Sequence, residues 1–132
     1  MASLDDPGVR ALLDAPNHAV VTTLGADGHP HSAVVWVDVQ DGRLALNSAV
    51  GRAWPTNLER DPRITVVVLD ERNPYTYVEV RGTARATLEG AEDHIERLAR
   101  KYTGDAYTGR TPGMQRVTYV VDAERVRYRD RD

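Results

Sequence analysis

The residues best suited to binding chemistry lie in the run Ser48–Arg63, SAVGRAWPTNLERDPR. Arg52 carries a guanidinium fork that can bind a phosphate through two parallel hydrogen bonds. Trp54 and Pro55 follow it, and we expect a short helix whose first backbone N–H groups, after Pro55, add donors aided by the helix dipole. The run connects two strand-like segments, where function often resides. It therefore predicts a phosphate-binding corner.

Other catalytic patterns are missing from the sequence. Its four histidines show no spacing typical of a metal site, and it has no cysteine, no P-loop, no dinucleotide-binding glycine motif and no nucleophile elbow. Tyr75 and Tyr77 follow a turn and could present their phenols to a substrate carbonyl, or instead seal a barrel mouth or a dimer contact. We therefore predict no metal, and only these two weak catalytic candidates.

The elements that must position these residues are mostly strands. Apolar alternation and β-branched runs predict strands, with Asp-Gly turns between several of them. Helical spacing predicts a first helix that Asp5 or Asp6 caps and that has Pro7 in its first turn, a late helix that ends at Gly104, and the short helix of the corner. The expected strands are 18–24, 30–39, 43–47, 64–69, 75–88 with a bend or bulge at Gly82, and 115–121 with 125–129. About six strands and two or three helices indicate a small closed or split barrel.

Length and charge limit the class of protein and its partners. The chain of 132 residues fits one domain, residues 1–132, around one core. Its net charge of −3 argues against a nucleic-acid partner. No apolar stretch approaches the roughly 20 residues that cross a bilayer. We therefore expect a cytoplasmic protein with no membrane partner.

The order of the motifs gives the chain a family resemblance. The corner has the pattern G-R-x-W-P-x-N-L-x-R-D-P-R, the segment Gly28–Trp36 precedes it, and the strand Asn73–Gly82 follows it. This order resembles the pyridoxamine-phosphate-oxidase-like split β-barrel superfamily, from about Val9 to Tyr128. Within it, the chain is most similar to the flavin/deazaflavin oxidoreductases of the FDOR-B type, which use coenzyme F420. The resemblance implies a mainly β (α+β) fold, a six-stranded antiparallel split β-barrel of the FMN-binding type with two or three flanking helices.

The resemblance also implies a cofactor site around the corner. Relatives present an arginine and, two residues later, a lysine to the cofactor phosphate; Arg52 matches the arginine, but Trp54 replaces the lysine. Trp54 would pack its apolar face on the cofactor or substrate, or else lie in the core or a dimer contact. The strand Ser32–Val37 would lie along the cofactor ring, and Lys101 would suit the acidic tail of F420. The expected cofactor-binding residues are Ser32, Val34, Trp36, Asn47, Ser48, Ala49, Arg52, Ala53, Trp54, Pro55, Asn57 and Lys101.

The function implied is that of an oxidoreductase in which reduced F420 donates a hydride to a small conjugated or carbonyl-bearing acceptor. Two alternatives remain open: an FMN-dependent oxidoreductase of the same fold, and a non-catalytic F420-binding or storage protein. The resemblance and the small size also imply a homodimer with the cofactor sites at its interface.

Overall fold

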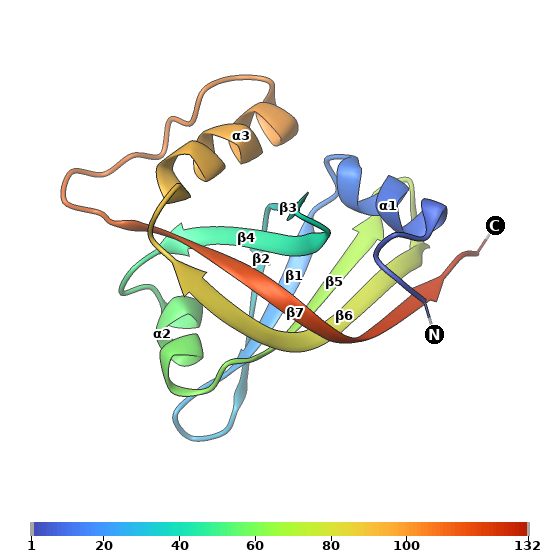
Figure 1. Ribbon diagram of the computed structural model, residues 1–132, viewed down its shortest axis with the longest axis horizontal. Helices are drawn as coiled ribbons and strands as arrows, with labels where there is room; N and C mark the ends of the chain where they lie inside the picture. The colour runs from blue at the N-terminus through green and yellow to red at the C-terminus, as the bar shows by residue number, and fades with distance from the viewer. Residues whose placement is uncertain (1, 132) are drawn as a thin grey trace.

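The computed structural model describes residues 2–131 and arranges them as one antiparallel sheet of seven strands with three helices (Figure 1). In the sheet the strands follow the order β2-β1-β5-β6-β7-β4-β3. The elements are α1 (Pro7–Asp14), β1 (Ala19–Leu24), β2 (Pro30–Val35), β3 (Val37–Gln40), β4 (Arg43–Ala49), α2 (Ala53–Arg60), β5 (Arg63–Asp70), β6 (Asn73–Thr87), α3 (Ala91–Thr103) and β7 (Arg116–Arg129). The expected mainly β fold, a split barrel with flanking helices, is confirmed.

One predicted strand is divided in two, so the sheet has seven strands where six were expected, and the division brings the two edges of the sheet together. The expected strand 30–39 is observed as β2 and β3, separated by Trp36. These two strands lie at opposite edges of the sheet, yet one residue joins them. Because neighbouring Cα atoms are about 3.8 Å apart, the two edges must meet at this end. The seven strands therefore curl into a barrel that is split along a seam, and Trp36 lies at one end of that seam.

The core fills the inside of this curled sheet. Alternate residues of β1, β5 and β6 point inward, as the period of two requires. Val21, Val66, Val68, Val78 and Val80 are fully buried there. The β-branched run that predicted a buried strand is thus explained by its position at the centre of the sheet.

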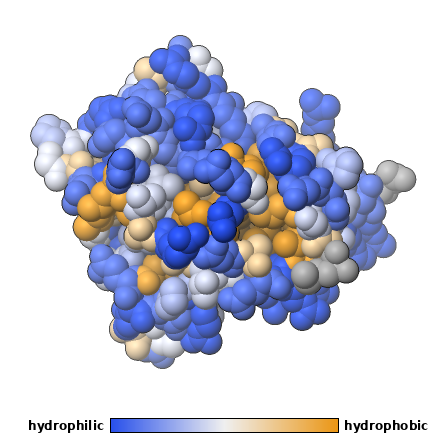
Figure 2. Space-filling view, in the orientation of Figure 1, coloured by the Kyte–Doolittle hydropathy of each residue, from blue (hydrophilic) through white to orange (hydrophobic). Residues whose placement is uncertain are grey.

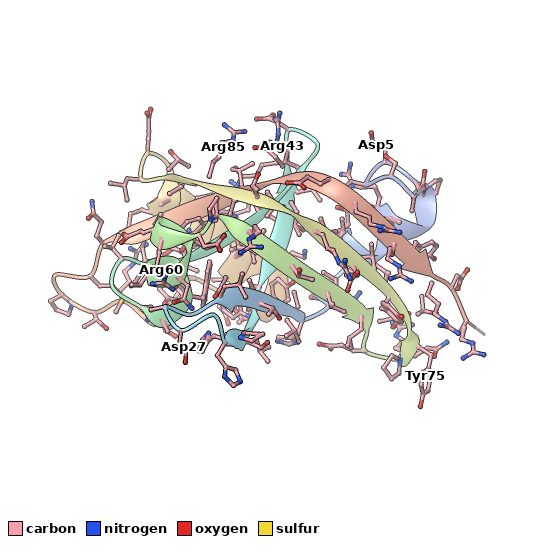
Figure 3. All side chains as sticks on the ribbon, turned by 90° about the horizontal axis from the view of Figure 1, so that it is seen from below. Asp5, Asp27, Arg43, Arg60, Tyr75 and Arg85 are labelled. Carbon is pink, nitrogen blue, oxygen red and sulfur yellow. The ribbon has the colours of Figure 1, made fainter. Side chains whose placement is uncertain are left out.

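The long strands β6 and β7 bend where glycine allows close approach. The register between them shifts at Gly82, which confirms the expected bulge. A Cβ at this position would lie 2.0 Å from the backbone oxygen of Asp122, so only glycine fits. Asp122 also pairs with Arg43 of β4 and Arg85 of β6, which lie close together in Figure 3. One carboxylate thus links three neighbouring strands across the bulge.

The helices cover different parts of the barrel. α1 packs against β3 and β5, α2 against β1, and α3 against β4 and β7 (Figure 1). Pro7 begins α1, and Gly104 ends α3 in the left-handed conformation, both as expected. Asp6 is the residue before α1, but its side chain accepts a hydrogen bond from the backbone of Ser3 (2.9 Å) rather than capping the helix.

The face of the molecule drawn in Figure 2 is mostly polar, with apolar residues in a band across its middle, over the strands. None of the three described helices is long and apolar enough to span a membrane.

Candidate functional site

A pocket of about 230 Å³ lies beside the barrel seam. The end of β2, the linking residue Trp36, β4, the start of α2, α3, the loop after α3 and the start of β7 all contribute to it. The lining residues are Val34, Val35, Trp36, Asn47, Ser48, Arg52, Trp54, Ile95, Leu98, Tyr107 and Arg116. This lining contains two arginines and no carboxylate.

Arg116 is a buried cation in the wall of this pocket, with 6% of its surface exposed. Its Nε donates to Oδ1 of Asn47 (2.9 Å), and its guanidinium lies 5.2 Å from the ring centroid of Tyr107. Within the described residues it forms no salt bridge, and Glu92, whose charge acts on it, is paired with Arg110. Burial, and the nearby charge of Arg52, hold the pKa of Arg116 below its ordinary value. A bound anion would compensate this charge.

Arg52, in the corner, lies near Arg116 in the wall of the pocket. Its Nη2 lies 3.5 Å from Sδ of Met114, and Nη1 of Arg116 lies 3.8 Å from that sulfur. A thioether is only a weak acceptor, so both guanidinium groups keep donors available. Two cations that converge without a carboxylate make this end of the pocket suitable for a phosphate or a similar anion.

The start of α2 differs from the expected one. The helix begins at Ala53, so Trp54 and Pro55 lie inside its first turn. The N–H of Thr56 already donates to the carbonyl of Arg52 (3.0 Å). The expectation of free donors after Pro55 is therefore wrong. By helix geometry, the N–H groups without a partner in the helix are those of Ala53 and Trp54, which precede the proline.

Two tryptophans form apolar walls of the pocket. The ring of Trp36 stacks on that of Tyr102, with centroids 5.3 Å apart and an angle of 11° between the planes. Trp54 is buried and packs on Tyr119 at 5.4 Å. Trp54 thus belongs both to the core and to the pocket, so the two alternatives for this residue are not exclusive. A flat aromatic ligand would find matching surfaces here.

The structure brings six of the predicted cofactor residues together in this pocket: Val34, Trp36, Asn47, Ser48, Arg52 and Trp54. It places others elsewhere. Ser32 bonds Thr22 on the outer face of the sheet (2.9 Å), and the amide of Asn57 donates to Thr23 (3.1 Å) and accepts from Arg60 (3.0 Å). Three more, Ala49, Ala53 and Pro55, flank the corner without lining the pocket.

Lys101 is occupied by the protein itself. Its Nζ donates to the carbonyls of Leu13 (2.5 Å) and Val37 (2.6 Å). Burial lowers its pKa, which the charges of Asp38 and Asp14 partly oppose. The structure therefore gives Lys101 a role in joining α3 to α1 and β3, and does not bring it into the pocket.

The two candidate tyrosines lie far from the pocket in the same chain. Tyr75 is 68% exposed and points away from the body of the protein (Figure 3). Tyr77 pairs with Arg129, at the opposite end of β7 from Arg116. Neither lines the pocket, so within one chain they do not reach a ligand held there.

Arg116 and the α3 residues of the pocket were not predicted as site residues. Arg116 heads a predicted strand, and a lone arginine before an apolar alternation, RVTYVV, is the only sequence signal for it. Ile95 and Leu98 belong to the apolar stripe of a helix, which does not distinguish core from pocket.

A larger cleft of about 720 Å³ lies between α1, the β5–β6 turn and the end of β7. Its lining mixes acidic Asp70, Glu71 and Asp130 with basic Arg72 and Arg131, so no charge of one sign selects a ligand. The described residues also contain no cluster of three or more histidines and carboxylates suited to a metal. The pocket at the seam is the stronger candidate because its charges lack counter-ions.

Comparisons with known proteins agree with this fold. Residues 6–130 match the pyridoxamine 5'-phosphate oxidase family (PNPOx_N). The chain belongs to this family of split-barrel oxidoreductases of the flavin type. None of the curated proteins matches the sequence.

Several solved structures are similar along almost the whole chain. One named as an F420 reductase superposes with a TM-score of 0.80 and 24% identity, over 89% of this chain and 94% of its own. The conserved hypothetical protein Rv2991 from Mycobacterium tuberculosis has a TM-score of 0.75 and 26% identity, over 96% and 84%. General Stress Protein 26 from Bacillus anthracis has a TM-score of 0.69 and 18% identity, over 95% and 93%.

Proposed function

We propose that this protein binds coenzyme F420 in the pocket at the barrel seam and reduces a small conjugated or carbonyl-bearing acceptor. The observation that carries the proposal is the convergence of Arg52 and buried Arg116 on a pocket that has no carboxylate. A phosphate would satisfy both guanidinium groups, and the aromatic walls suit a flat ring system. The similarity to an F420 reductase supports the choice of cofactor.

The pocket residues fit such a cofactor in chemical type. When bound, a reduced deazaflavin supplies a hydride, so no nucleophile or acid-base pair is required of the protein. Arg52 and Arg116 would hold the phosphate, with the N–H groups of Ala53 and Trp54 as further donors. Trp36 and Leu98 would exclude water from the ring. The protein would thus bind the cofactor, orient it and exclude water from the reacting atoms.

The homodimer belongs to this proposal because one chain forms only part of a cofactor site. The pocket volume of about 230 Å³ is below the roughly 300–1,000 Å³ usual for such ligands. Val34, at the edge of the pocket, is 69% exposed, so an apolar side chain borders the pocket without cover in the single chain. A second copy over this edge would cover Val34 and complete the walls.

The proposal is tested by titrating the purified protein separately with F420 and with FMN, following cofactor fluorescence and calorimetry. We expect saturable binding of F420 at micromolar concentration. Arg52→Ala and Arg116→Ala should each weaken it by about ten- to a hundredfold, since each removes a charge-assisted hydrogen bond. Arg72→Ala, an arginine of the other cleft, is the matched control and should bind as the wild type does.

Three outcomes decide between the alternatives. No binding of F420 and tight binding of FMN, with a yellow protein, would replace F420 by FMN. Binding of F420 without turnover of enones, quinones or other conjugated acceptors would make the protein a carrier. No binding of either cofactor would refute the proposal.

A further inference from the structure

A chain of hydrogen-bonded polar side chains lies behind the pocket, and the function proposed above gives two of its members, His94 and Asp38, no role. His94 of α3 is 2% exposed. Its Nδ1 lies 2.8 Å from Oγ1 of Thr118 and 3.3 Å from Nδ2 of Asn47, and its Nε2 lies 2.8 Å from Oδ1 of Asp38. The other carboxylate oxygen of Asp38 accepts a hydrogen bond from Nε of Arg97 (3.0 Å). The chain thus runs from the surface, at Arg97, to a residue of the pocket, Asn47.

The chemistry of these groups fixes the direction of each hydrogen bond. An ionised carboxylate can only accept hydrogen bonds. Nε2 of His94 must therefore carry a hydrogen and donate a hydrogen bond to Asp38. In the neutral ring Nδ1 is then an acceptor, and it faces the hydroxyl of Thr118 and the amide nitrogen of Asn47. The same amide nitrogen donates to the carbonyl of Ala91 (2.9 Å).

The amide of Asn47 is therefore held in one orientation. Its nitrogen faces the acceptors on α3, and its oxygen faces the pocket, where it accepts from Nε of Arg116 (2.9 Å). A flipped amide would set two donors, its own NH₂ group and the Nε–H of Arg116, against each other. Three groups face this nitrogen, namely the carbonyl of Ala91, Oγ1 of Thr118 (3.3 Å) and Nδ1 of His94, and together they keep the oxygen of Asn47 toward Arg116.

We propose that His94 and Asp38 are positioning residues for the anion site. They help to fix the amide of Asn47, which holds Arg116 through Nε. Nη2 of Arg116 is then available for an anion, and Nη1 makes only long contacts, with the neutral hydroxyl of Tyr107 (3.4 Å) and the sulfur of Met114 (3.8 Å). This inference rests on the proposed function only in that Arg116 binds the anion. It adds that two residues outside the pocket set the geometry of that arginine.

The first test uses the wild-type protein and needs no variant to fold. NMR of ¹⁵N-labelled protein near neutral pH should show His94 as the Nε2–H tautomer. It should also show an Nε–H signal of Arg116 that is protected from exchange. The opposite tautomer, with the proton on Nδ1, would overturn the inference.

The second test compares two replacements of the ring. His94→Asn can place an oxygen near the position of Nδ1, while His94→Gln can replace only Nε2. With pyrophosphate as the probe, calorimetry should show about five- to tenfold weaker binding for His94→Gln, and loss of the protected Arg116 signal. His94→Asn should stay within about twofold of the wild type, because one acceptor toward Asn47 remains. His29→Gln, at an exposed histidine, is the control.

The outcomes separate this inference from the proposed function. If Arg116→Ala does not weaken pyrophosphate binding, the anion site itself is wrong. If Arg116→Ala weakens it but His94→Gln changes neither the affinity nor the Arg116 signal, the anion site stands and the positioning role of His94 is refuted.

Discussion

At the scale of single residues, Arg116 and Asp38 are two charges that folding removes from water in different ways. Asp38 receives hydrogen bonds from His94 and Arg97, so its charge is compensated within the protein. Arg116 donates to the amide oxygen of Asn47 and contacts the hydroxyl and ring of Tyr107 and the sulfur of Met114, none of which carries a charge. Burying a charge without a counter-ion costs free energy, which a binding site recovers when its ligand arrives. The difference indicates a structural role for Asp38 and a ligand for Arg116.

Asp38→Asn tests the structural role through its pH dependence. Burial raises the pKa of Asp38, but the hydrogen bonds and charges of His94 and Arg97 outweigh it and hold the pKa below its ordinary value of 3.8. A depressed folded-state pKa stabilises the protein above the unfolded pKa, and this stabilisation is lost as the pH falls through the folded pKa. We expect the free energy of unfolding of the variant to be lower than that of the wild type by about 1–3 kcal/mol at neutral pH.

The measurement is urea denaturation followed by circular dichroism. The difference in the free energy of unfolding between the wild type and Asp38→Asn should narrow as the pH falls below 3.8, because the wild-type carboxylate then takes up a proton. The exposed Asp105→Asn should show no such difference. A gap that stays constant down to the folded pKa and beyond would contradict the ionic role of Asp38.

At the scale of elements, α3 controls the geometry of the seam. The backbone of Val37, next to Trp36, is bonded by two side chains of this helix: its carbonyl by Lys101 (2.6 Å) and its N–H by the hydroxyl of Tyr102 (3.1 Å). Burial raises the pKa of Tyr102 to about 12, so this phenol stays protonated. The ring of Tyr102 also supports Trp36. One helix end therefore fixes the residue at which β2 passes into β3.

Lys101→Met separates this structural role from a role in cofactor binding. The variant keeps an apolar stem but leaves the carbonyls of Leu13 and Val37 without their donor. We expect a loss of about 1–3 kcal/mol in the free energy of unfolding, and F420 affinity within about twofold of the wild type. Arg100→Met, at an exposed position of the same helix, should change neither. A loss of F420 affinity without a loss of stability would return Lys101 to the cofactor site.

At the scale of the whole molecule, the outer face of the sheet has two halves of different character. On β2, β1 and β5 the cross-strand neighbours Val34, Val20 and Val67 form an apolar row, and Arg63 lies further along β5 on the same face. On β6 and β7 the same face carries charged residues, such as Arg81 opposite Arg125. This apolar row beside an incomplete pocket is the surface we expect a second copy to cover.

Val67→Lys tests this arrangement outside the pocket. The new ammonium can pair with Glu79, its cross-strand neighbour, so the fold should tolerate the change. In a dimer the charge would be buried against the partner, so light scattering should show a dimeric wild type and a mostly monomeric variant. Leu88→Lys, at an apolar residue that is 52% exposed elsewhere, should remain dimeric. A wild-type protein that is monomeric at all concentrations would exclude the homodimer.

Local patterns were sufficient for most of the fold. The bulge at Gly82, the end of α3 at Gly104 and the corner at Arg52 follow from turn chemistry and periodicity, which act over a few residues. The break at Trp36 was not predictable in this way. It depends on two sheet edges meeting, and the run PHSAVVWVDVQ looks locally like one strand.

The candidate site, like the fold, was predictable from local sequence only in part. The sequence by itself determined the fold class, and six of the twelve residues expected to bind the cofactor line the pocket. The corner residues among them were predictable because a polar corner between buried strands is a local feature. Only the tertiary structure showed that Arg116 faces Arg52, that His94 lies behind Asn47, and that Lys101 is bound to backbone carbonyls. These contacts join residues far apart in the chain. Whether a charged side chain is free for a ligand depends on what the fold places around it, and residue type and spacing do not encode that directly.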